Sequence, residues 1–461
     1  MKGEYNMTRL FGTDGIRGKT GNDLTRELAA NIGEKLATLL SHGGEKPKIL
    51  LARDTRISGQ MLALAVASGI CSAGGEVLWA DVIPTPAVAY LTVKYGASAG
   101  VMITASHNPA EYNGIKIFGE DGHKLQDELE EKIEAMMSLP SSSLVCGADI
   151  GTVRLCSSAL SDYENYLISL SPSPLSDLHI ALDCAFGTAS VSAERIFSSL
   201  GAKCDMLFDS PDGINVNSGC GSTDISYLSE YVRKNGLRGG AAFDGDADRC
   251  VCVDENGSPL DGDVIMAALA LDMKESGMLR GGMVGTVMSN FGLVRFCEEN
   301  EIRFIQTKVG DRYVSEEMRL WDYNFGGEQS GHIIFGDVMP TGDGQLTAIM
   351  LFSLMRRSGK KLSELAAAVK KMPQLSKNIP ATPEQKIAFL TDGEIKAYLS
   401  EVKQRLGKHG RLVARPSGTE PCIRLTAESD DEKLLPALLG SAAEKIAARI
   451  KSVGKEDICA E

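Results

Sequence analysis

The sequence lacks the features that would place the chain in or across a membrane. No run reaches about 18 consecutive apolar residues, so we expect no membrane-spanning helix. The most apolar stretch, residues 61–82, is interrupted by Glu76 and Asp81. The first 12 residues hold no apolar segment of a secretory signal. We therefore expect no membrane partner.

The sequence also lacks a cysteine-based metal site. Its 11 cysteines are scattered, with no Cys-x-x-Cys pair and no Cys/His cluster, so we expect no zinc. The closest pair, Cys250 and Cys252, flanks one residue inside a strand-like run. An odd number of cysteines without a secretory signal is typical of reduced thiols in a cytoplasm. Most should be small core residues, and the expected location is cytoplasmic.

Excess positive charge and a nucleotide loop are missing as well. The 48 Lys and Arg residues face 61 Asp and Glu residues, which gives a formal charge of −13. This balance argues against the basic face that sequence-independent nucleic-acid binding needs, so we expect no nucleic-acid partner. It does not exclude a phosphate, because one local Arg/Lys cluster is enough to bind it. No GxxxxGK[ST] loop is present, so nothing indicates that such a phosphate belongs to a nucleotide.

What the sequence does contain is a repeated strand–helix rhythm. Its 461 residues allow about three or four domains. With 43% hydrophobic and 24% charged residues it is typical of a globular protein rather than a disordered chain or a coiled coil. The expected strands are 48–52, 76–83, 99–104, 179–184, 204–208, 240–243, 282–288 and 304–309. The expected helices are 58–72, one opening at 84–86, 190–200, 226–234, 264–274 and 291–300. This alternation indicates doubly wound α/β domains.

Composition also suggests where the domains divide. Residues 138–151 and 169–176 are rich in Ser and Pro, which disfavours helix and strand, and a third break lies around 372–383. The C-terminal part predicts a smaller α+β domain with a helix, two strands at 411–415 and 422–427, and a closing helix at 431–451. We predict three doubly wound mixed α/β domains of similar topology, 1–158, 159–258 and 259–374, and a fourth domain, 375–461.

The strongest local signal is Asp244-Gly-Asp-Ala-Asp-Arg249, directly after a predicted strand. In an extended segment the alternating Asp244, Asp246 and Asp248 would point to one side. Carboxylate oxygens suit a hard dication such as Mg²⁺; the alternative is a solvated acidic turn. An EF-hand loop is excluded, because Glu255 does not stand in the required context. Arg249 would bind a phosphate or fix the loop.

A second signal is Thr104-Ala-Ser-His-Asn-Pro109 at the end of a predicted strand. Open α/β sheets place their ligands at strand ends, so Ser106 is a candidate nucleophile or phosphoryl carrier. The alternative is an ordinary turn closed by Asn-Pro. The sequence has no Gly-x-Ser-x-Gly elbow. Ser106 would therefore need activation by a metal or a bound phosphate rather than by a hydrolase triad.

Two further loops carry groups that suit a sugar phosphate. In Arg415-Pro-Ser-Gly-Thr-Glu-Pro421, a guanidinium, hydroxyls and backbone N–H groups could form a phosphate cradle; the alternative is a structural turn. In Gly326-Gly-Glu-Gln-Ser-Gly-His332, a carboxylate and a hydroxyl suit the vicinal hydroxyls of a sugar. Further possible anion contacts lie in the turns 12–18, 53–59, 113–116 and 309–312.

Together these motifs resemble the α-D-phosphohexomutase family. Ser-His-Asn-Pro, Asp-Gly-Asp-Ala-Asp-Arg, Gly-Glu-Gln-Ser-Gly-His and Arg-Pro-Ser-Gly-Thr-Glu-Pro occur in the family's order and approximate spacing. Each motif alone is weak, but four in order are highly specific. The resemblance runs from Phe11 to about Lys451, and residues 9–18 look like the branch that acts on glucosamine phosphates.

The resemblance implies a heart-shaped protein with its active site in a central cleft. Ser106 would be the phosphoserine, and one Mg²⁺ per chain would be held by Asp244, Asp246 and Asp248 with one phosphoserine oxygen. Lys116 and His332 would lie near the reacting hydroxyl, with Arg17 and Arg249 beside them. The sugar hydroxyls would contact Glu328 and Ser330, and the non-reacting phosphate would contact Arg415, Ser417, Gly418, Thr419 and Arg424.

The implied reaction interconverts glucosamine 6-phosphate and glucosamine 1-phosphate through a 1,6-bisphosphate. A hexose or hexosamine 1,6-bisphosphate would be the activator, and the chain would be a monomer or a homodimer. The first alternative is a phosphomannomutase/phosphoglucomutase. A Mg²⁺-dependent sugar phosphatase of the haloacid-dehalogenase type would leave Ser106 and the last domain without a role. A non-catalytic sugar-phosphate module would tolerate loss of Ser106, which is present here.

Overall fold

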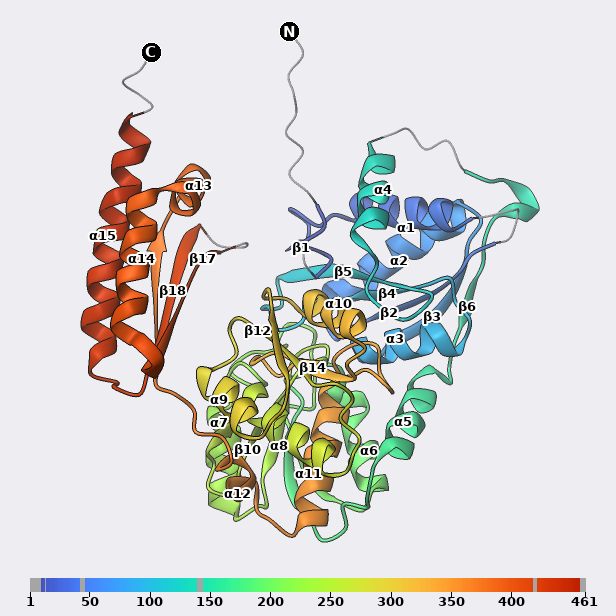
Figure 1. The fold of residues 1–461 in the computed structure, drawn as a ribbon. Coiled ribbons are helices and arrows are strands. Elements are labelled where there is room, and N and C mark those ends of the chain that lie inside the picture. Colours follow the sequence, from blue (N-terminus) through green and yellow to red (C-terminus); the bar gives the residue numbers. More distant parts are fainter. Residues whose placement is uncertain (1–9, 13, 42–45, 139–143, 418–420, 457–461) are drawn as a thin grey trace. The chain divides into compact units, whose positions relative to one another are not determined.

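The structure, a computed structural model, describes residues 10–12, 14–41, 46–138, 144–417 and 421–456 (Figure 1). The chain divides into two compact units, one of residues 1–286 with 302–368 and one of 287–301 with 369–461. Within the described residues, no helix combines the length and the apolar character needed to cross a bilayer.

The first sheet of the larger unit has six strands in the order β1-β5-β4-β2-β3-β6. The strands are β1 (Ile16–Lys19), β2 (Lys48–Arg53), β3 (Glu76–Val82), β4 (Ala99–Ile103), β5 (Tyr112–Gly119) and β6 (Val153–Leu155). Parallel pairing joins β4, β2, β3 and β6, while β5 and β1 run antiparallel at one edge. One core covers a face of this sheet with α1 (Arg26–Leu40), α2 (Ile57–Ser72) and α4 (Asp127–Met137), and α3 (Thr85–Lys94) also packs on the sheet.

The second sheet has five strands in the order β11-β10-β9-β7-β8. These strands are β7 (His179–Asp183), β8 (Lys203–Leu207), β9 (Gly240–Phe243), β10 (Cys250–Val253) and β11 (Pro259–Leu260). The flanking helices are α5 (Ala159–Leu170), α6 (Ala193–Ser199) and α7 (Ser226–Asn235), with a short 3-10 turn at Thr188–Val191. Another 3-10 turn, Gly147–Asp149, precedes β6 of the first sheet. The strands β9 and β10 are buried throughout, so they read as continuous apolar runs.

The third sheet has four strands in the order β13-β12-β14-β15. Its strands are β12 (Met283–Thr286), β13 (Phe304–Thr307), β14 (Phe325–Gly327) and β15 (Ile333–Phe335). The helices of this part of the chain are α8 (Gly262–Glu275), α10 (Asp311–Trp321), α11 (Gly344–Ser358) and α12 (Leu362–Ala366), of which α11 packs on β9 and β10 of the second sheet. Asp261 caps α8 and Asp343 caps α11, each by accepting a hydrogen bond from a backbone N–H of the first turn.

The smaller unit is built on an antiparallel sheet in the order β16-β18-β17. Its elements are α9 (Phe291–Glu299), β16 (Gln374–Pro380), α13 (Pro383–Thr391), α14 (Gly393–Leu406), a 3-10 turn (Gly407–His409), β17 (Gly410–Pro416), β18 (Cys422–Ser429) and α15 (Leu434–Glu456). Apolar residues of β18, α14 and α15 form the core of this unit.

The structure confirms the mixed α/β class and most expected strands, and it adds elements that were not expected, among them β1, β5, β6, β14 and β15 and the helices α1, α4, α10 and α11. Two of the expected segments also differ. The break expected around 372–383 contains β16, which pairs with β18 over its whole length. It was missed because six of its seven residues are exposed, so the edge strand carries no apolar pattern. The helix expected at 190–200 divides into a 3-10 turn and α6, because Ser192 at ψ −38° and φ −126° leaves the helical region. The boundaries of the four predicted domains stay predictions.

Candidate active site

Ser106 lies in the loop after β4 and is fully buried. Its φ of +53° is in the left-handed region, which is costly for a residue that carries a Cβ. The Ser106 N–H donates to Thr104 Oγ1 at 3.0 Å, and Ser106 Oγ donates to Asp244 Oδ2 at 2.6 Å. The strained turn therefore presents the hydroxyl to a carboxylate from the second sheet.

Arg56 supports the Ser106 loop from α2. Its side chain is fully buried, and its Nε donates to Asp54 Oδ2 at 2.8 Å. The remaining four N–H groups donate to the carbonyl oxygens of Ser106, Asn108, Pro109 and Tyr112, at distances from 2.6 to 3.0 Å. All five donors of this guanidinium are thus occupied. The turn 53–59 therefore does not offer Arg56 to an anion, contrary to the expectation from sequence.

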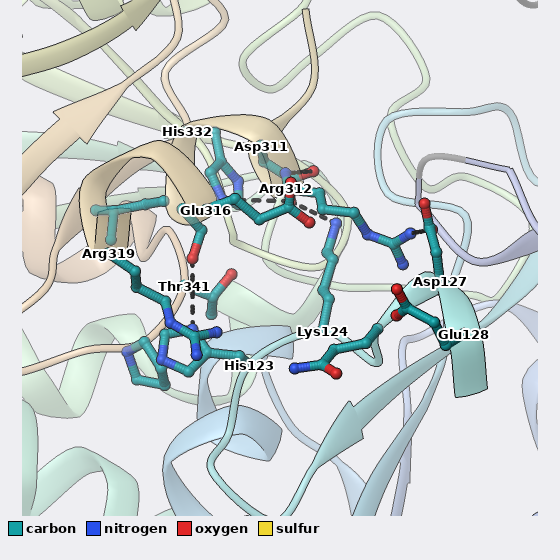
Figure 2. A pocket seen from close by; sticks show the side chains of 14 residues that line it. His123, Lys124, Asp127, Glu128, Asp311, Arg312, Glu316, Arg319, His332 and Thr341 are labelled. Carbon is teal, nitrogen blue, oxygen red and sulfur yellow. Dashed lines mark hydrogen bonds and ion pairs between the residues drawn. The ribbon is translucent and has the colours of Figure 1, made fainter. Parts of the chain in front are cut away.

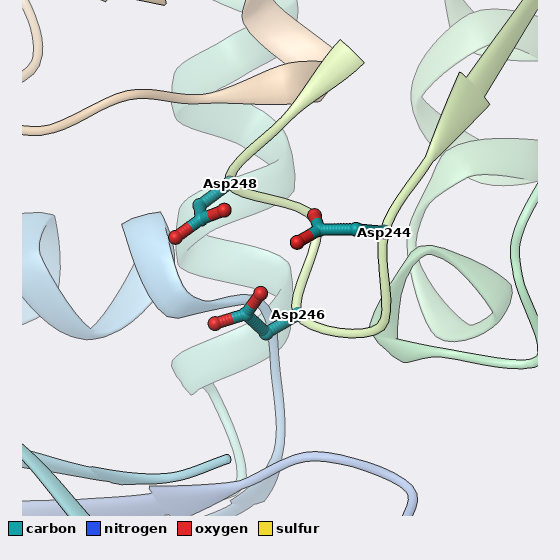
Figure 3. Close-up of side chains that lie close together, drawn as sticks. All are labelled: Asp244, Asp246 and Asp248. Atoms are coloured by element: carbon teal, nitrogen blue, oxygen red, sulfur yellow. The ribbon is translucent and has the colours of Figure 1, made fainter. Parts of the chain in front are cut away.

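Asp244, Asp246 and Asp248 converge after β9, as Figure 3 shows. One oxygen from each carboxylate lies within 4.8 Å of the others, and all three side chains are buried. Ala247 between them has a φ of +59°, so this loop is strained like the Ser106 loop. Thr85 Oγ1 donates to Asp246 Oδ2 at 2.6 Å and fixes the middle carboxylate.

Among the residues that the structure describes, two oxygen atoms of these carboxylates are left free to bind a divalent cation. Within the described chain, Asp246 Oδ1 and Asp248 Oδ1 are buried and have no hydrogen-bond partner. Burial and the two neighbouring aspartates raise the pKa of Asp244 well above its ordinary range. Buried oxygen atoms crowded in this way suit a hard, oxygen-ligated ion such as Mg²⁺.

Lys116 reaches the triad from β5. Its Nζ lies 2.9 Å from Asp246 Oδ2 and 3.0 Å from Asp248 Oδ2. Burial alone lowers the pKa of Lys116, but Asp14 and the two triad aspartates together raise it well above its ordinary value. Lys116 is therefore a buried cation at neutral pH, placed directly against two of the carboxylates.

His332 approaches Asp248 from the end of the loop between β14 and β15. Its Nε2 accepts a hydrogen bond from the Gly342 N–H at 3.0 Å, and its Nδ1 lies 3.7 Å from Asp248 Oδ2. Burial lowers the pKa of His332, but Asp248 and Asp311 raise it above the ordinary value. A Cβ at position 342 would stand 2.5 Å from the imidazole ring, so this close approach requires glycine.

Arg249 lies beside the triad, and Arg17 is linked to it through Asp14 and Lys116. Arg249 Nε is 3.8 Å from Asp248 Oδ1 and 4.0 Å from Asp244 Oδ2, and this buried Nε has no hydrogen-bond partner within the described chain. Arg17 lies on β1 and donates to Asp14. Positive charge is thus supplied from two sheets, which suits a phosphoryl group near Ser106.

The predicted sugar loop connects β14 and β15. Glu328 is half-buried, and its Oε1 accepts from the Gly310 N–H at 3.0 Å. Burial and the nearby Asp311 raise the pKa of Glu328. Ser330 is exposed, at the tip of a turn in which the Gly331 N–H donates to the Glu328 carbonyl at 3.0 Å. The larger unit therefore brings together Ser106, the triad, Lys116, His332, Arg17, Arg249 and the Glu328 loop.

The predicted phosphate loop lies in the smaller unit. Arg415 on β17 and Arg424 on β18 are directly opposed partners of the antiparallel pair. Burial and Arg424 lower the pKa of Arg415, so an anion between the two guanidinium groups would relieve their repulsion. Ser417 is buried beside them, and its carbonyl accepts from Lys386 Nζ at 2.6 Å. Gly418 and Thr419 lie outside the described residues.

Several residues of this region were missed by the sequence reasoning. Asn217 Nδ2 donates to the Ser106 carbonyl at 2.9 Å, and Asp14 contacts Lys116, Arg17 and Lys124. Asp14 and Asp311 do lie within the turns 12–18 and 309–312, but those turns were noted for their cations. Asn217 and Lys124 carried no signal, because an isolated Asn or Lys is ordinarily a solvated surface residue.

Comparison with known proteins identifies the class of protein that carries this site. Models of the phosphoglucomutase/phosphomannomutase family match almost the entire chain: alpha/beta/alpha domain I at residues 8–142, domain II at 161–257, domain III at 261–372 and the C-terminal domain at 357–445. The chain belongs to this α-D-phosphohexomutase family, whose members are isomerases that transfer phosphate within a sugar.

Individual relatives cover nearly the full length. The chain is 45% identical to the phosphoglucosamine mutase of Clostridium botulinum (strain Kyoto / Type A2) over 96% of this chain and 100% of that protein. It is 46% identical to the phosphoglucosamine mutase of Thermoanaerobacter pseudethanolicus over the same shares. A crystal structure of a phosphoglucomutase/phosphomannomutase family protein from Burkholderia thailandensis has a TM-score of 0.81 at 21% identity and covers 96% of this chain and 98% of that one, which shows a shared fold.

Proposed function

We propose that the protein interconverts glucosamine 6-phosphate and glucosamine 1-phosphate through a phosphoserine at Ser106 and a glucosamine 1,6-bisphosphate. The observation that carries the proposal is the 2.6 Å hydrogen bond from Ser106 Oγ to Asp244, inside a buried carboxylate triad that Lys116 also contacts. A phosphate esterified to Ser106 would stand directly against a cation site. The choice of glucosamine rests on the 45–46% identity to phosphoglucosamine mutases.

In this mechanism the bond between phosphorus and Ser106 Oγ breaks while a bond forms from phosphorus to O1 of glucosamine 6-phosphate. His332 is the candidate to receive the proton of that hydroxyl, and Lys116, as a buried cation, is the candidate to donate a proton to the departing Ser106 Oγ. The bisphosphate then turns over and returns its 6-phosphoryl to Ser106. Arg17 and Arg249 balance charge near the transferring group. Mg²⁺ held by the three aspartates would stabilise negative charge on the phosphoryl oxygens.

Two loops would bind the rest of the substrate. Glu328 and Ser330 would hydrogen-bond the sugar hydroxyls. Arg415, Ser417, Gly418, Thr419 and Arg424 would bind the phosphate that does not react. One Mg²⁺ per chain, activation by a hexose or hexosamine 1,6-bisphosphate, a cytoplasmic location and a monomeric or homodimeric state belong to the same proposal.

The proposal is tested by comparing kcat/KM for glucosamine, glucose and mannose 6-phosphates with the phosphorylated enzyme. A contact to the amine contributes about 1.5–3 kcal/mol, or roughly 10- to 150-fold in kcat/KM, in favour of glucosamine. A preference for mannose or glucose phosphate would make the chain a phosphomannomutase/phosphoglucomutase.

Two controls separate the mutase from a phosphatase. Release of inorganic phosphate without formation of the 1-phosphate would favour the phosphatase. The Ser106→Ala variant should fold normally and lose mutase activity by several orders of magnitude, whereas Ser358→Ala, which removes a hydroxyl bonded to its own helix, should not.

A further inference from the structure

Lys124 joins two parts of the larger unit close to the proposed active site. It follows β5, and its Nζ contacts Asp14 Oδ1 on one side and Asp311 Oδ2 at the start of α10 on the other. Figure 2 shows Lys124 reaching toward Asp311 beside His332. Lys124 and Asp311 are each about 10% exposed at the side chain. Both charges are therefore largely removed from water. An ion pair in such a position is screened less than one on the surface.

Asp14 and Asp311 each contact a second basic side chain, and these contacts complete a closed ring of charged residues. Asp14 Oδ2 lies 3.3 Å from Lys116 Nζ, and Asp311 Oδ2 lies 3.5 Å from His332 Nε2, an electrostatic contact without a hydrogen bond because Nε2 accepts from Gly342. Lys116 and His332 in turn both contact Asp248, at 3.0 and 3.7 Å. Going round the ring, basic and acidic side chains alternate in the order Lys116, Asp14, Lys124, Asp311, His332, Asp248.

The ring connects residues that come from different sheets. Lys116 lies on β5 of the first sheet, and His332 stands at the edge of β15 in the third. Their only shared direct partner in the ring is Asp248, so a second connection through Lys124 fixes their separation from the opposite side. Removing Lys124 would leave the buried Asp311 and the partly buried Asp14 without their common cation, although Asp14 keeps Arg17. The two aspartates would then draw Lys116 and His332 away from Asp248.

We propose that Lys124 is a positioning residue for phosphoryl transfer, which acts through Asp14 and Asp311 to hold Lys116 and His332 against the carboxylate triad. The inference rests on the proposed function, because it assigns Lys124 a role through the two residues proposed to move the proton. A displacement of about 1 Å at such groups lowers a rate by up to about 100-fold.

A neighbouring ion pair provides a matched control. Arg312, the residue after Asp311, contacts Asp127 and Glu130 of α4 and donates to the Leu125 carbonyl at 2.9 Å. It too joins α10 to the segment after β5, and its side chain is 8% exposed. Within the described residues its side chain contacts no member of the ring; only its backbone N–H donates to Asp311 Oδ1, at 2.9 Å, and a change of side chain leaves that bond in place. Its guanidinium is occupied by Asp127, Glu130 and the Leu125 carbonyl, so Arg312 does not offer the anion contact expected in the turn 309–312. Loss of Arg312 therefore removes a comparable buried connection without removing the proposed positioning.

The experiment measures kcat, KM and the thermal midpoint for Lys124→Met, Lys124→Arg and Arg312→Met, each with Mg²⁺ and a 1,6-bisphosphate present. Lys124→Met is expected to lower kcat about 10- to 100-fold while KM stays within about threefold. Lys124→Arg keeps the charge and should recover kcat to within about fivefold of the wild type. Arg312→Met should lower the thermal midpoint at least as much as Lys124→Met and leave kcat within about twofold.

A second measurement tests the ring itself. In Lys124→Met the buried Asp311 is left without its cation, so adding Asp311→Asn should not lower kcat further and should restore part of it. If the two single substitutions lower kcat by factors that multiply in the double variant, Lys124 and Asp311 act independently and the proposed ring is wrong. Equal losses of kcat in Lys124→Met and Arg312→Met would show that Lys124 is merely structural.

Failure of this inference is distinguishable from failure of the proposed function. The variants are assayed with whichever hexose phosphate the wild-type enzyme converts best. An inactive wild type contradicts the proposed function, whereas an active wild type with an unaffected Lys124→Met contradicts only the positioning role.

Discussion

Ser106 and Arg56 have different roles in one loop: Ser106 presents the hydroxyl, and Arg56 holds the backbone around it. Ser106 occupies a left-handed backbone conformation that a serine does not favour, and the five donors of Arg56 hold the surrounding carbonyls in place. The motif around Ser106 was recognisable from sequence because it combines a hydroxyl with a strand end. The role of Arg56 was not recognisable from sequence, because an arginine in a turn can equally bind a phosphate or be buried against backbone carbonyls.

Asp343 carries a pH dependence of stability. It is buried, caps α11 through the Leu346 N–H and accepts the Tyr163 hydroxyl at 2.8 Å. Burial raises its pKa from 3.8 to about 7. Because the folded pKa is raised, the stability from this group is fully present below pH 3.8 and is lost as the pH rises through 7.

We therefore expect Asp343→Asn, which can still cap the helix, to gain stability relative to the wild type as the pH rises. Between pH 5 and pH 8 the wild type should lose about 2–3 kcal/mol more than the variant. Urea unfolding at the two pH values measures the difference. The same gain at both pH values would show that Asp343 does not titrate in this range.

Among the helices and strands, the buried strands could be predicted from the sequence and the exposed edge strand could not. The buried strands β2, β4, β9 and β12 were found close to their ends, since continuous apolar runs between turn residues identify them. The exposed edge strand β16 was not found. The three loops that carry the larger unit's motifs follow β4, β9 and β14; a strand end was expected before the first two, whereas β14 was not expected. Which distant residues join them, such as Lys124 and Asp311, depends on packing between sheets that local sequence does not encode.

The contact between α1 and α2 depends on two glycines. A Cβ at Gly69 would lie 1.9 Å from the Ala30 carbonyl oxygen, and one at Gly33 would lie 2.3 Å from the Val66 carbonyl oxygen. Gly69→Ala would force the two backbones apart, which costs about 1–3 kcal/mol or more. The unfolding midpoint should fall accordingly. Gly393→Ala at the start of α14, where the added Cβ meets nothing, is the control and should leave the midpoint unchanged or raise it slightly.

The metal loop after β9 gives a second prediction at this scale. The ligands proposed there are oxygen atoms alone, so a chelator should abolish activity and Mg²⁺ should restore it, while thiol-seeking metals should restore it poorly. Asp246→Asn removes one ligand charge and should need more Mg²⁺ for half-maximal activity. Titration of activity with Mg²⁺ measures this shift. Full activity of the variant in metal-free buffer would contradict the assignment of the triad.

For the whole molecule, the proposed function assigns binding groups to each of the two units, and the proposed substrate gives the reason. A hexose bisphosphate has a phosphate at each end, and the proposed transfer happens at one end at a time. The reacting phosphoryl is assigned to Ser106 and the triad in the larger unit. Under the proposed function the other phosphate would need fixed positive charge, and Arg415 and Arg424, which are opposed on β17 and β18, are the residues proposed to supply it.

Arg415→Ala should therefore weaken substrate binding more than it slows the chemistry. Removing one charge-assisted hydrogen bond costs about 1.5–3 kcal/mol, so KM for the hexose 6-phosphate should rise roughly 10- to 150-fold. Arg415→Lys keeps the charge but not the planar guanidinium, so its KM should lie between those of Arg415→Ala and the wild type. Arg411→Ala on the same strand, whose side chain binds Glu428, is the control for damage to the sheet. Steady-state kinetics at saturating Mg²⁺ give the values, and a KM for Arg415→Ala equal to that of Arg411→Ala would place the phosphate elsewhere.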